Sequence, residues 1–384
     1  MKRFLALFFV VIFMTGSLCA CEVKGSVGKA AGNDSSDAKK LKIVTTIFPE
    51  YDWVKNLVGD VANAEITMLL DNGVDLHSYQ PTVNDIVKIT DCDLFIYVGG
   101  ESDKWVDDVL KQSKNSNRKV IDLLEALGDA VKAEEIVEGM EHEHDHDEDE
   151  DHDHDGGHDE DGDHDHDGDH DEDDDHEGDH DEDGDHEGDH DHEDGDDHDH
   201  AHSHEEELDE HVWLSLRNAS VLCGVITDAL CELDEAHKDA YRTNLESYQA
   251  KLTALDEKYK EAVKSATYKT LLFGDRFPFR YLTDDYGLSY YAAFTGCSAE
   301  SEASFETITF LSGKLNELGL PAIMTIEGKN HKIAESIRSA SNAKDQQILT
   351  LDSLQSTTSK DVAGGASYLK SMEENLETLK QALK

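Results

Sequence analysis

Short apolar stretches alternate with amphipathic stretches along most of the chain. Residues 41–49 are rich in β-branched and apolar side chains and end at a proline, and helical spacing follows from Tyr51 to Val58. This order predicts a strand that leads directly into a helix. The same patterns predict strands at residues 65–70 and 93–98 and helices at residues 82–90 and 104–112.

A long amphipathic stretch begins at Asp234. Apolar and aromatic residues recur there at spacings of three and four, at Tyr241, Leu245, Tyr248, Leu252, Leu255, Tyr259 and Val263. This spacing predicts one helix over residues 234–266, roughly 45 Å long at about 1.5 Å per residue. A coiled-coil seam is the alternative, but a single such stretch between two alternating regions favours a stiff connecting helix.

Beyond residue 266 the alternation of strands and helices resumes. Strands are expected at residues 270–273, 289–294, 322–326 and 347–351, and helices at residues 304–318, 332–339 and 368–383. Strands that alternate with helices indicate βαβ units and mainly parallel sheets. The chain is therefore predicted to be an α/β protein with two lobes, residues 41–233 and 267–384, joined by one long rigid helix.

The formal charge of −53 is concentrated in one segment. Of the 87 Asp and Glu residues, 41 lie between Glu141 and Glu210, where there is no Lys or Arg. The rest of the chain has the composition of an ordinary acidic globular protein. Because nucleic-acid binding needs a basic surface, this composition disfavours it.

The first residues have the pattern of a bacterial export signal. Lys2 and Arg3 precede an apolar run that is too short to favour a membrane-spanning helix. The run ends Leu-Cys-Ala-Cys, which resembles a lipoprotein cleavage site, so residues 1–20 are interpreted as a signal peptide and Cys21 as the lipidated cysteine. Simple secretion with a free Cys21 thiol is the alternative. Residues 21–40 are mostly small and polar, as in a flexible tether.

Four more cysteines follow, which are Cys92, Cys223, Cys231 and Cys297. Cys223 and Cys231 are about two turns apart in a helical pattern, so they cannot form a local disulfide. A chain of this length does not need covalent cross-links, and the four cysteines are interpreted as small buried apolar residues.

Residues 141–206 form a low-complexity tract of Asp-His, Glu-His and Gly-Asp-His units. The tract holds 18 of the 22 histidines, and the four outside it are His77, His211, His237 and His331. With almost no apolar residue, the tract cannot bury enough surface to offset its ordering entropy. We expect a disordered loop inserted in the first lobe.

The tract has the side chains of a metal-binding segment. Imidazole and carboxylate groups bind late first-row divalent ions, so we expect many weak sites for zinc, nickel or copper. The histidines expected to bind include His142, His144, His146, His198, His200, His202 and His204. A solvated acidic spacer, or a pH-responsive segment with histidine pKa values near about 6.5, is the alternative.

Several segments together resemble a known family. They are TTIFPEYDWVKNLVGD, GVDLHSYQPT, the acidic histidine-rich tract, DEHVWLS and LDSL. From Lys42 to the C-terminus, the chain is similar to the zinc and manganese solute-binding proteins of ABC transporters, of the cluster A-I type. The resemblance implies two α/β lobes joined by one long helix, with a metal ion held in the cleft between the lobes.

The resemblance also implies metal ligands. His77 in GVDLHSYQP and His211 in EHVWLS match the two histidines that the family carries in its first lobe. Asp352 in LTLDSL matches the family's carboxylate ligand from the second lobe. A lone histidine in a loop is more often structural or solvated, so these assignments depend on the surrounding segments.

The sequence departs from the family at one further ligand. Zinc-binding members carry a histidine, and manganese-binding members a glutamate, in the first loop of the second lobe. Here that run reads FGDRFPFRYL, with Gly274 at the ligand position, and the adjacent Asp275 is the preferred replacement. Its alternative role is to pair with Arg276 or Arg280. Other candidates for the missing ligand are Glu327, His331, His202, His204 and water.

Two imidazoles with one or two carboxylates suit tetrahedral zinc, whereas manganese prefers oxygen-rich sites of higher coordination. The resemblance implies that the protein captures a metal ion outside the cytoplasm and delivers it to an ABC transporter permease and its ATPase, and the ligand set favours Zn²⁺ as that ion. The protein is expected to be a lipid-anchored monomer. Binding of manganese or another divalent ion, and a surface zinc buffer or adhesin, are the alternatives. A secreted hydrolase is disfavoured because no HExxH or nucleophile-elbow pattern occurs.

Overall fold

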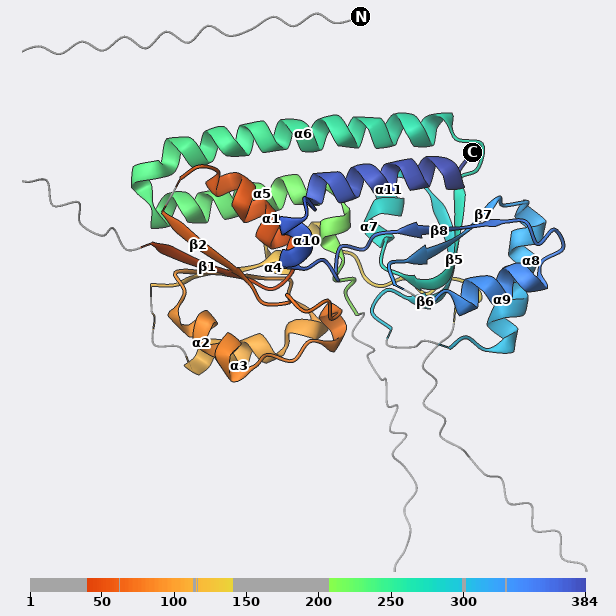
Figure 1. The fold of residues 1–384 in the computed structure, drawn as a ribbon, viewed down its shortest axis with the longest axis horizontal. Coiled ribbons are helices and arrows are strands. Elements are labelled where there is room, and N and C mark those ends of the chain that lie inside the picture. The colour runs from red at the N-terminus through yellow and green to blue at the C-terminus, as the bar shows by residue number, and fades with distance from the viewer. Residues whose placement is uncertain are drawn as a thin grey trace, which may run out of the picture. The chain divides into compact units, whose positions relative to one another are not determined.

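Two four-stranded parallel sheets, one in each lobe, lie along a long helix (Figure 1). The computed structural model describes residues 40–61, 63–112, 115, 117–140, 207–298, 302–328 and 330–384. The predicted α/β fold with two parallel-sheet lobes and one long helix is confirmed. Cys21 and the histidine-rich tract lie outside the described residues.

The sheet of the first lobe has the strand order β2-β1-β3-β4. Its strands are β1 (Leu41–Thr45), β2 (Ala64–Met68), β3 (Leu94–Tyr97) and β4 (Lys119–Asp122). The helices are α1 (Phe48–Val58), α2 (Val83–Asp91), α3 (Trp105–Gln112), α4 (Leu123–Leu127) and α5 (Leu216–Leu233), with 3₁₀ helices η1 (Leu76–Ser78), η2 (Glu101–Asp103), η3 (Gly128–Ala130) and η4 (Val212–Leu214). Strand β3 is almost wholly buried, as expected for a central parallel strand covered on both faces.

The junction between β1 and α1 shows how the sequence directs the strand into the helix. Pro49 lies in the first turn of α1, where its missing N–H would have no helical partner. The Glu50 carboxylate accepts hydrogen bonds from the backbone N–H groups of Thr46 (2.7 Å) and Ile47 (3.3 Å). These bonds fix the direction of α1, so that Trp53 enters the core.

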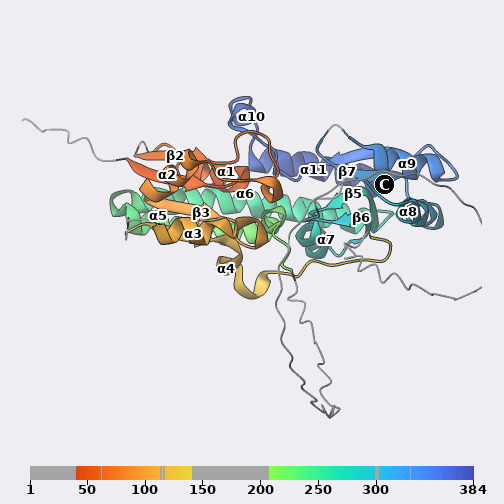
Figure 2. The ribbon, with the colours of Figure 1, turned by 90° about the horizontal axis from the view of Figure 1, so that it is seen from below.

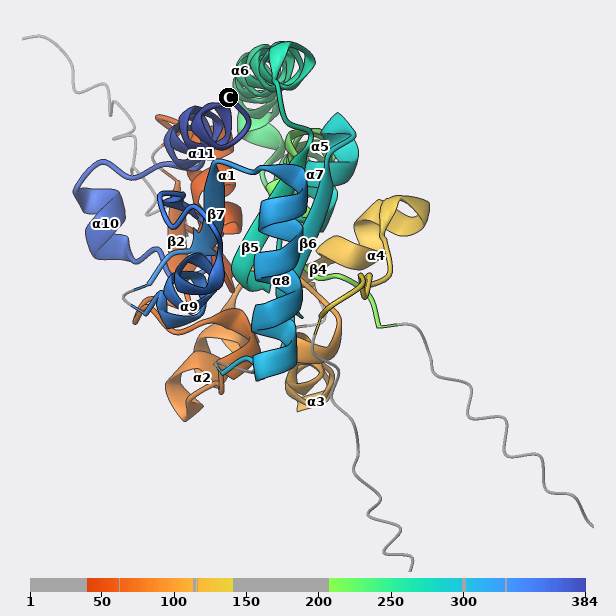
Figure 3. The same cartoon turned by 90° about the vertical axis from the view of Figure 1, so that its right-hand side faces the viewer.

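The sheet of the second lobe has the strand order β6-β5-β7-β8. Its strands are β5 (Thr270–Phe277), β6 (Ser289–Thr295), β7 (Ala322–Ile326) and β8 (Gln347–Leu351). The helices are α7 (Arg280–Tyr286), α8 (Phe305–Leu318), α9 (Lys332–Ala340), α10 (Ser359–Ala363) and α11 (Tyr368–Ala382). Figure 3 shows this lobe end-on, with α8 and α9 nearest the viewer. Strand β5 continues past the predicted end at residue 273, with an irregularity in its pairing before Arg276.

Helix α6 (Lys238–Ser265) has 28 residues, which corresponds to about 42 Å. It packs against α1 and α5 of the first lobe and against α7 and α11 of the second (Figures 1 and 2). The helix starts later than predicted because η5 (Glu235–His237) precedes it. There the Asp234 carboxylate accepts hydrogen bonds from His237 Nδ1 and the Tyr241 hydroxyl. No helix in the described ranges is both long enough and apolar enough to cross a bilayer.

Buried contacts connect the two lobes near the middle of α6. At the start of α11, the Tyr368 hydroxyl donates to the carbonyl of Trp213 (2.6 Å), and its ring meets Trp53 edge-on at 5.3 Å. Trp213 Nε1 in turn donates to the carbonyl of Ser353 (2.9 Å). One apolar core includes residues from both lobes and α6. Wide separation of the lobes would break this core, so the fold favours small relative movements.

We expect Tyr368→Phe to destabilise the protein by about 1–3 kcal/mol, because it leaves the buried Trp213 carbonyl without its donor. Urea denaturation followed by tryptophan fluorescence measures the change. Tyr291→Phe, which alters a partly exposed tyrosine of β6, is the matched control and should change stability little. Equal stability of Tyr368→Phe and the parent would contradict this role of the hydroxyl.

Candidate metal site

His77 lies in η1, in a loop of the first lobe. Asp75, two residues before His77, caps this turn. Its Oδ1 accepts a hydrogen bond from the backbone N–H of His77 (3.0 Å). Its Oδ2 accepts a hydrogen bond from Nη2 of Arg276 in β5 (2.6 Å). Asp75 therefore fixes the backbone that carries His77 and connects it to the second lobe.

His211 immediately precedes η4 and is completely buried. Its ring Nδ1 lies 3.0 Å from Asp209 Oδ1, and its backbone N–H donates to the same oxygen (2.9 Å). Because a carboxylate only accepts hydrogen bonds, Nδ1 carries a proton. Such a partner fixes the orientation of the ring and directs Nε2 toward a ligand.

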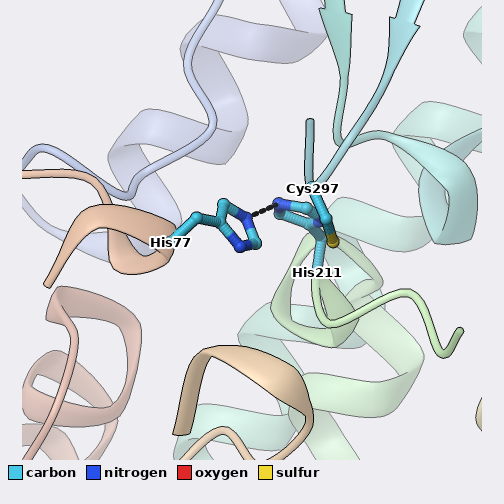
Figure 4. Close-up of side chains that lie close together, drawn as sticks. All are labelled: His77, His211 and Cys297. Carbon is cyan, nitrogen blue, oxygen red and sulfur yellow. Dashed lines mark hydrogen bonds between the residues drawn. The ribbon is translucent and has the colours of Figure 1, made fainter. Parts of the chain in front are cut away.

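The two imidazoles converge although they are 134 residues apart in sequence. Their Nε2 atoms lie 3.2 Å apart, and the rings point toward each other (Figure 4). On the far side of its ring, His77 Nδ1 lies 2.8 Å from Ser102 Oγ and 3.5 Å from Glu210 Oε2. Two Zn–N bonds of about 2.05 Å at a tetrahedral angle place the nitrogens about 3.3 Å apart. The pair is thus spaced to bind one ion.

The surroundings give the two histidines different proton affinities. Burial, and then the positive charge that His211 can carry, lower the pKa of His77 to about 3, although Asp75 acts in the opposite direction. Burial also acts to lower the pKa of His211, but the Asp209 carboxylate raises it overall. His77 is therefore neutral at physiological pH, and its Nε2 can bind a metal ion without first losing a proton.

Cys297 completes a three-residue group with these histidines. It follows β6 in the second lobe, and its Sγ and one nitrogen of each imidazole all lie within 4.8 Å of one another (Figure 4). No other such group of three His, Cys, Asp or Glu side chains occurs within the described ranges. Its backbone N–H donates to Glu134 Oε1 (2.8 Å), and burial raises the pKa of the thiol.

The adjacent Gly296 makes this approach possible. A Cβ atom at this position would lie 2.9 Å from Cε1 of His211 and 2.9 Å from the carbonyl oxygen of Phe277. Only glycine lets the loop after β6 pack directly on the imidazole. Sequence reasoning interpreted Cys297 as a buried apolar residue. The overlooked signal was a Gly-Cys pair at the carboxyl end of a predicted parallel strand, where α/β proteins place their ligands.

The structure does not group Asp352, the expected carboxylate ligand, with the two imidazoles. Its backbone N–H donates to Asn375 Oδ1 in α11 (2.8 Å), and its own Oδ1 accepts from the N–H of Leu354 (2.9 Å). The side chain lines a cavity bordered by α10 and α11, which is not the cavity that His77 lines. Contacts within its own loop and with α11 thus turn the carboxylate away.

Asp275, the preferred replacement for the missing ligand, is not grouped with the imidazoles either. Asp275 and His77 line one cavity of about 330 Å³, but both Asp275 oxygens are engaged, by the backbone N–H of Arg276 (2.9 Å) and of Ile326 (3.2 Å). It lies outside the three-residue group. At Gly274, a Cβ atom would lie 2.6 Å from Cα of Ala334 in α9. No ligand side chain fits at that position in this packing.

The remaining candidates for the missing ligand are not in the group either. Glu327 accepts hydrogen bonds from the backbone N–H and hydroxyl of Ser353 (2.7 and 2.6 Å). His331 lies just before α9. His202, His204 and the other histidines of the tract lie outside the described residues. Asp209, Ser102 and Glu210, which contact the imidazoles, were not singled out from the sequence.

Comparison with known proteins identifies the family. The sequence profile of ZnuA, the periplasmic component A of zinc-uptake complexes, matches residues 43–382. The chain belongs to the ZnuA family. This confirms the resemblance drawn from the sequence. Members of the ZnuA family are solute-binding components of transporters and not enzymes, as expected from the sequence resemblance.

Individual relatives of the chain agree with its assignment to the ZnuA family. The chain is 28% identical to the zinc-binding lipoprotein AdcA of Streptococcus pneumoniae over 97% of its own length and 60% of the relative's, so it spans about 60% of that protein. It is 28% identical to the high-affinity zinc uptake system protein ZnuA of Bacillus subtilis, over 93% of this chain and 92% of that one. The Zn(II)-bound ZnuA-like domain of S. pneumoniae AdcA superposes with a TM-score of 0.60 at 25% identity, covering 90% of this chain and 99% of that domain.

We expect Gly296→Ala to weaken zinc binding at least about tenfold, as disturbance of a ligand's surroundings typically does, because the new methyl group displaces the His211 ring or the loop. Isothermal titration calorimetry measures the loss. Gly313→Ala in α8 is the matched control, since a Cβ atom there has no neighbour within 4 Å. An unchanged zinc affinity for Gly296→Ala would show that the close approach is unnecessary.

We expect the stability gain from Asp352→Asn to depend on pH. The pKa of aspartate is about 3.9 in an unfolded chain. In the folded chain, burial first and the Glu327 charge second raise the pKa of Asp352 to about 6. The folded state therefore binds the proton more tightly, and the stability of the parent falls as the pH rises from about 4 to about 6.

Asparagine does not titrate and can still accept the hydrogen bond from Leu354. The stability of Asp352→Asn relative to the parent should therefore rise through that pH window and then level off. Urea denaturation of both proteins at several pH values measures the difference. A difference that stays flat with pH would refute the raised pKa.

Proposed function

We propose that the chain captures a zinc ion between its two lobes, with His77 and His211 as ligands, and delivers it to an ABC transporter permease and its ATPase. The convergence of the two Nε2 atoms carries the proposal. Both atoms face the same point, and both rings are oriented from behind by hydrogen bonds. His211 is completely buried and His77 is largely buried. The zinc-uptake role of the family supports the choice of ion.

The proposal includes the parts that lie outside the described residues. Cys21 anchors the chain to the outer face of the membrane through lipid, residues 21–40 act as a tether, and the protein works as a monomer. The name of the S. pneumoniae relative, a zinc-binding lipoprotein, supports the anchor. Functionally, residues 41–233 and 267–384 act as the two metal-binding lobes and residues 234–266 as their connection.

The histidine-rich tract serves as a collector for the buried site. The residues that flank it are paired, because Ala133 and Leu208 form an antiparallel bridge and the N–H of Asp209 donates to the carbonyl of Lys132 (2.9 Å). The tract is thus followed, within a few residues, by His211. Tethered weak sites raise the local concentration of metal beside the tight site.

Release follows from small movements rather than from wide opening. Asp75 is hydrogen-bonded both to the backbone of His77 and to Arg276 of the other lobe. A shift of this pair when the permease docks would move His77 away from His211 while the buried contacts along α6 persist. Moving the two Nε2 atoms apart by a fraction of a metal–nitrogen bond length is enough to weaken zinc binding.

Loss of either imidazole should abolish tight zinc binding. We expect His77→Ala and His211→Ala to lower the affinity by at least about a hundredfold, above what loss of an outer contact costs. Calorimetric titration of each variant measures this. His237→Ala is the matched control, since this histidine also contacts a carboxylate, Asp234 (2.7 Å), but lies at the start of α6.

Deletion of residues 141–206 tests the collector role in the same assay. One tight zinc site should remain and the weak sites should disappear. Loss of the tight site together with the weak sites would contradict the proposal that the buried pair and the tract act separately.

A further inference from the structure

We propose that Cys297 is the third zinc ligand, supplying a thiolate in place of the histidine or glutamate that the family carries, and that it selects thiophilic ions over manganese. This inference rests on the proposed function, because it concerns the ion bound by His77 and His211. It is carried by the position of Sγ, which lies within 4.8 Å of a ring nitrogen of each imidazole.

The packing of the second lobe explains why the ligand comes from this loop. Gly274 of β5, the family's expected ligand position, cannot supply it, because Ala334 leaves no room for a side chain there. Arg276 is held by Asp75 across the lobe boundary (2.6 Å). Strand β6 lies next to β5 in the sheet, and its last residue, Thr295, pairs with Phe277 of β5. The loop after β6 therefore starts at the same carboxyl edge.

The loop itself is shaped to present a sulfur atom. Gly296 packs against the His211 ring, and Glu134 accepts the backbone N–H of Cys297. A short side chain is required this close to the two rings. Tetrahedral Zn–S and Zn–N bonds of about 2.3 and 2.05 Å place sulfur and nitrogen about 3.6 Å apart. The observed group, within 4.8 Å, reaches this geometry by small adjustments.

The other described thiols are poor candidates for the same role. Cys92, Cys223 and Cys231 are buried, and none belongs to a group of potential metal ligands in the described ranges. Cys297 is the partly exposed one. When the ion binds, the thiol gives its proton to solvent as the Sγ–zinc bond forms.

A thiolate changes which ions the site accepts. Soft thiolate ligands favour Zn²⁺, whereas Mn²⁺ prefers carboxylate and water oxygens. Three protein ligands also leave one tetrahedral position for an exchangeable ligand, as in other zinc sites that keep an open position. Cys297 is therefore a specificity-determining ligand for a thiophilic divalent cation.

Cobalt substitution tests the sulfur ligand directly. A cobalt(II) ion bound to a thiolate gives a strong near-ultraviolet sulfur-to-metal charge-transfer band, whereas histidine and carboxylate ligands do not. The histidine-rich tract contains no cysteine, so ions bound there cannot produce the band. We would add one equivalent of cobalt to the chain that begins after Cys21, and then titrate with zinc.

We expect the band in the parent and in Cys231→Ser, its loss on addition of zinc, and its absence in Cys297→Ser. Zinc should also protect Cys297 of the parent protein from alkylation. Mass spectrometry measures this protection, and the test requires no substitution. Cys297→Asp, which offers an oxygen ligand of similar size, should lower the ratio of zinc to manganese affinity at least about tenfold.

The outcomes separate this inference from the function on which it rests. Tight zinc binding without the band, or a band that persists in Cys297→Ser, would overturn the thiolate ligand and leave the function standing. Absence of any tight zinc site in the parent would overturn both.

Discussion

Two histidine rings, His211 buried and His77 largely buried, are held so that their Nε2 atoms face one point, and the rest of the site depends on this. Each ring is fixed from behind, His211 by the Asp209 carboxylate and His77 by the Ser102 hydroxyl. These partners determine which nitrogen faces inward, and burial keeps His77 neutral. A preorganised pair of imidazole donors binds a divalent ion without the cost of assembling the site. The charged side chains of Asp75, Asp209 and Glu210 contact the two histidines from behind.

The fold protects this arrangement by restricting how the lobes move. Helix α6 packs along both lobes, and Tyr368, Trp213 and Ser353 form a buried chain of hydrogen bonds between them. The contacts that cross between the lobes close to the metal site include polar ones, such as the ion pair of Asp75 with Arg276. The molecule is thus stiff along α6 and adjustable at the site. This suits a protein that must bind an ion tightly and still release it to a partner.

Sequence reasoning succeeded where local pattern decides structure. Alternating apolar stretches predicted most of the parallel strands, and the recurring spacing from Tyr241 to Val263 predicted α6, because side-chain periodicity follows directly from backbone geometry. The short elements β4, α4, α7 and α10 have too few residues to show a period and were not predicted. His77 and His211 were singled out because their flanking segments resemble those of the family, and the structure brings the two rings together.

Cys297 could not be singled out in that way, because its position beside the imidazoles depends on packing between segments distant in sequence. Nothing local shows that Ala334 fills the space beside Gly274, that Asp352 turns toward α11, or that Cys297 arrives from the neighbouring strand. The most direct test of the account is anomalous diffraction at the zinc edge from crystals grown with one equivalent of zinc. The account predicts one strong peak bonded to Nε2 of His77, Nε2 of His211 and Sγ of Cys297. A principal peak elsewhere, with the two rings apart, would contradict it.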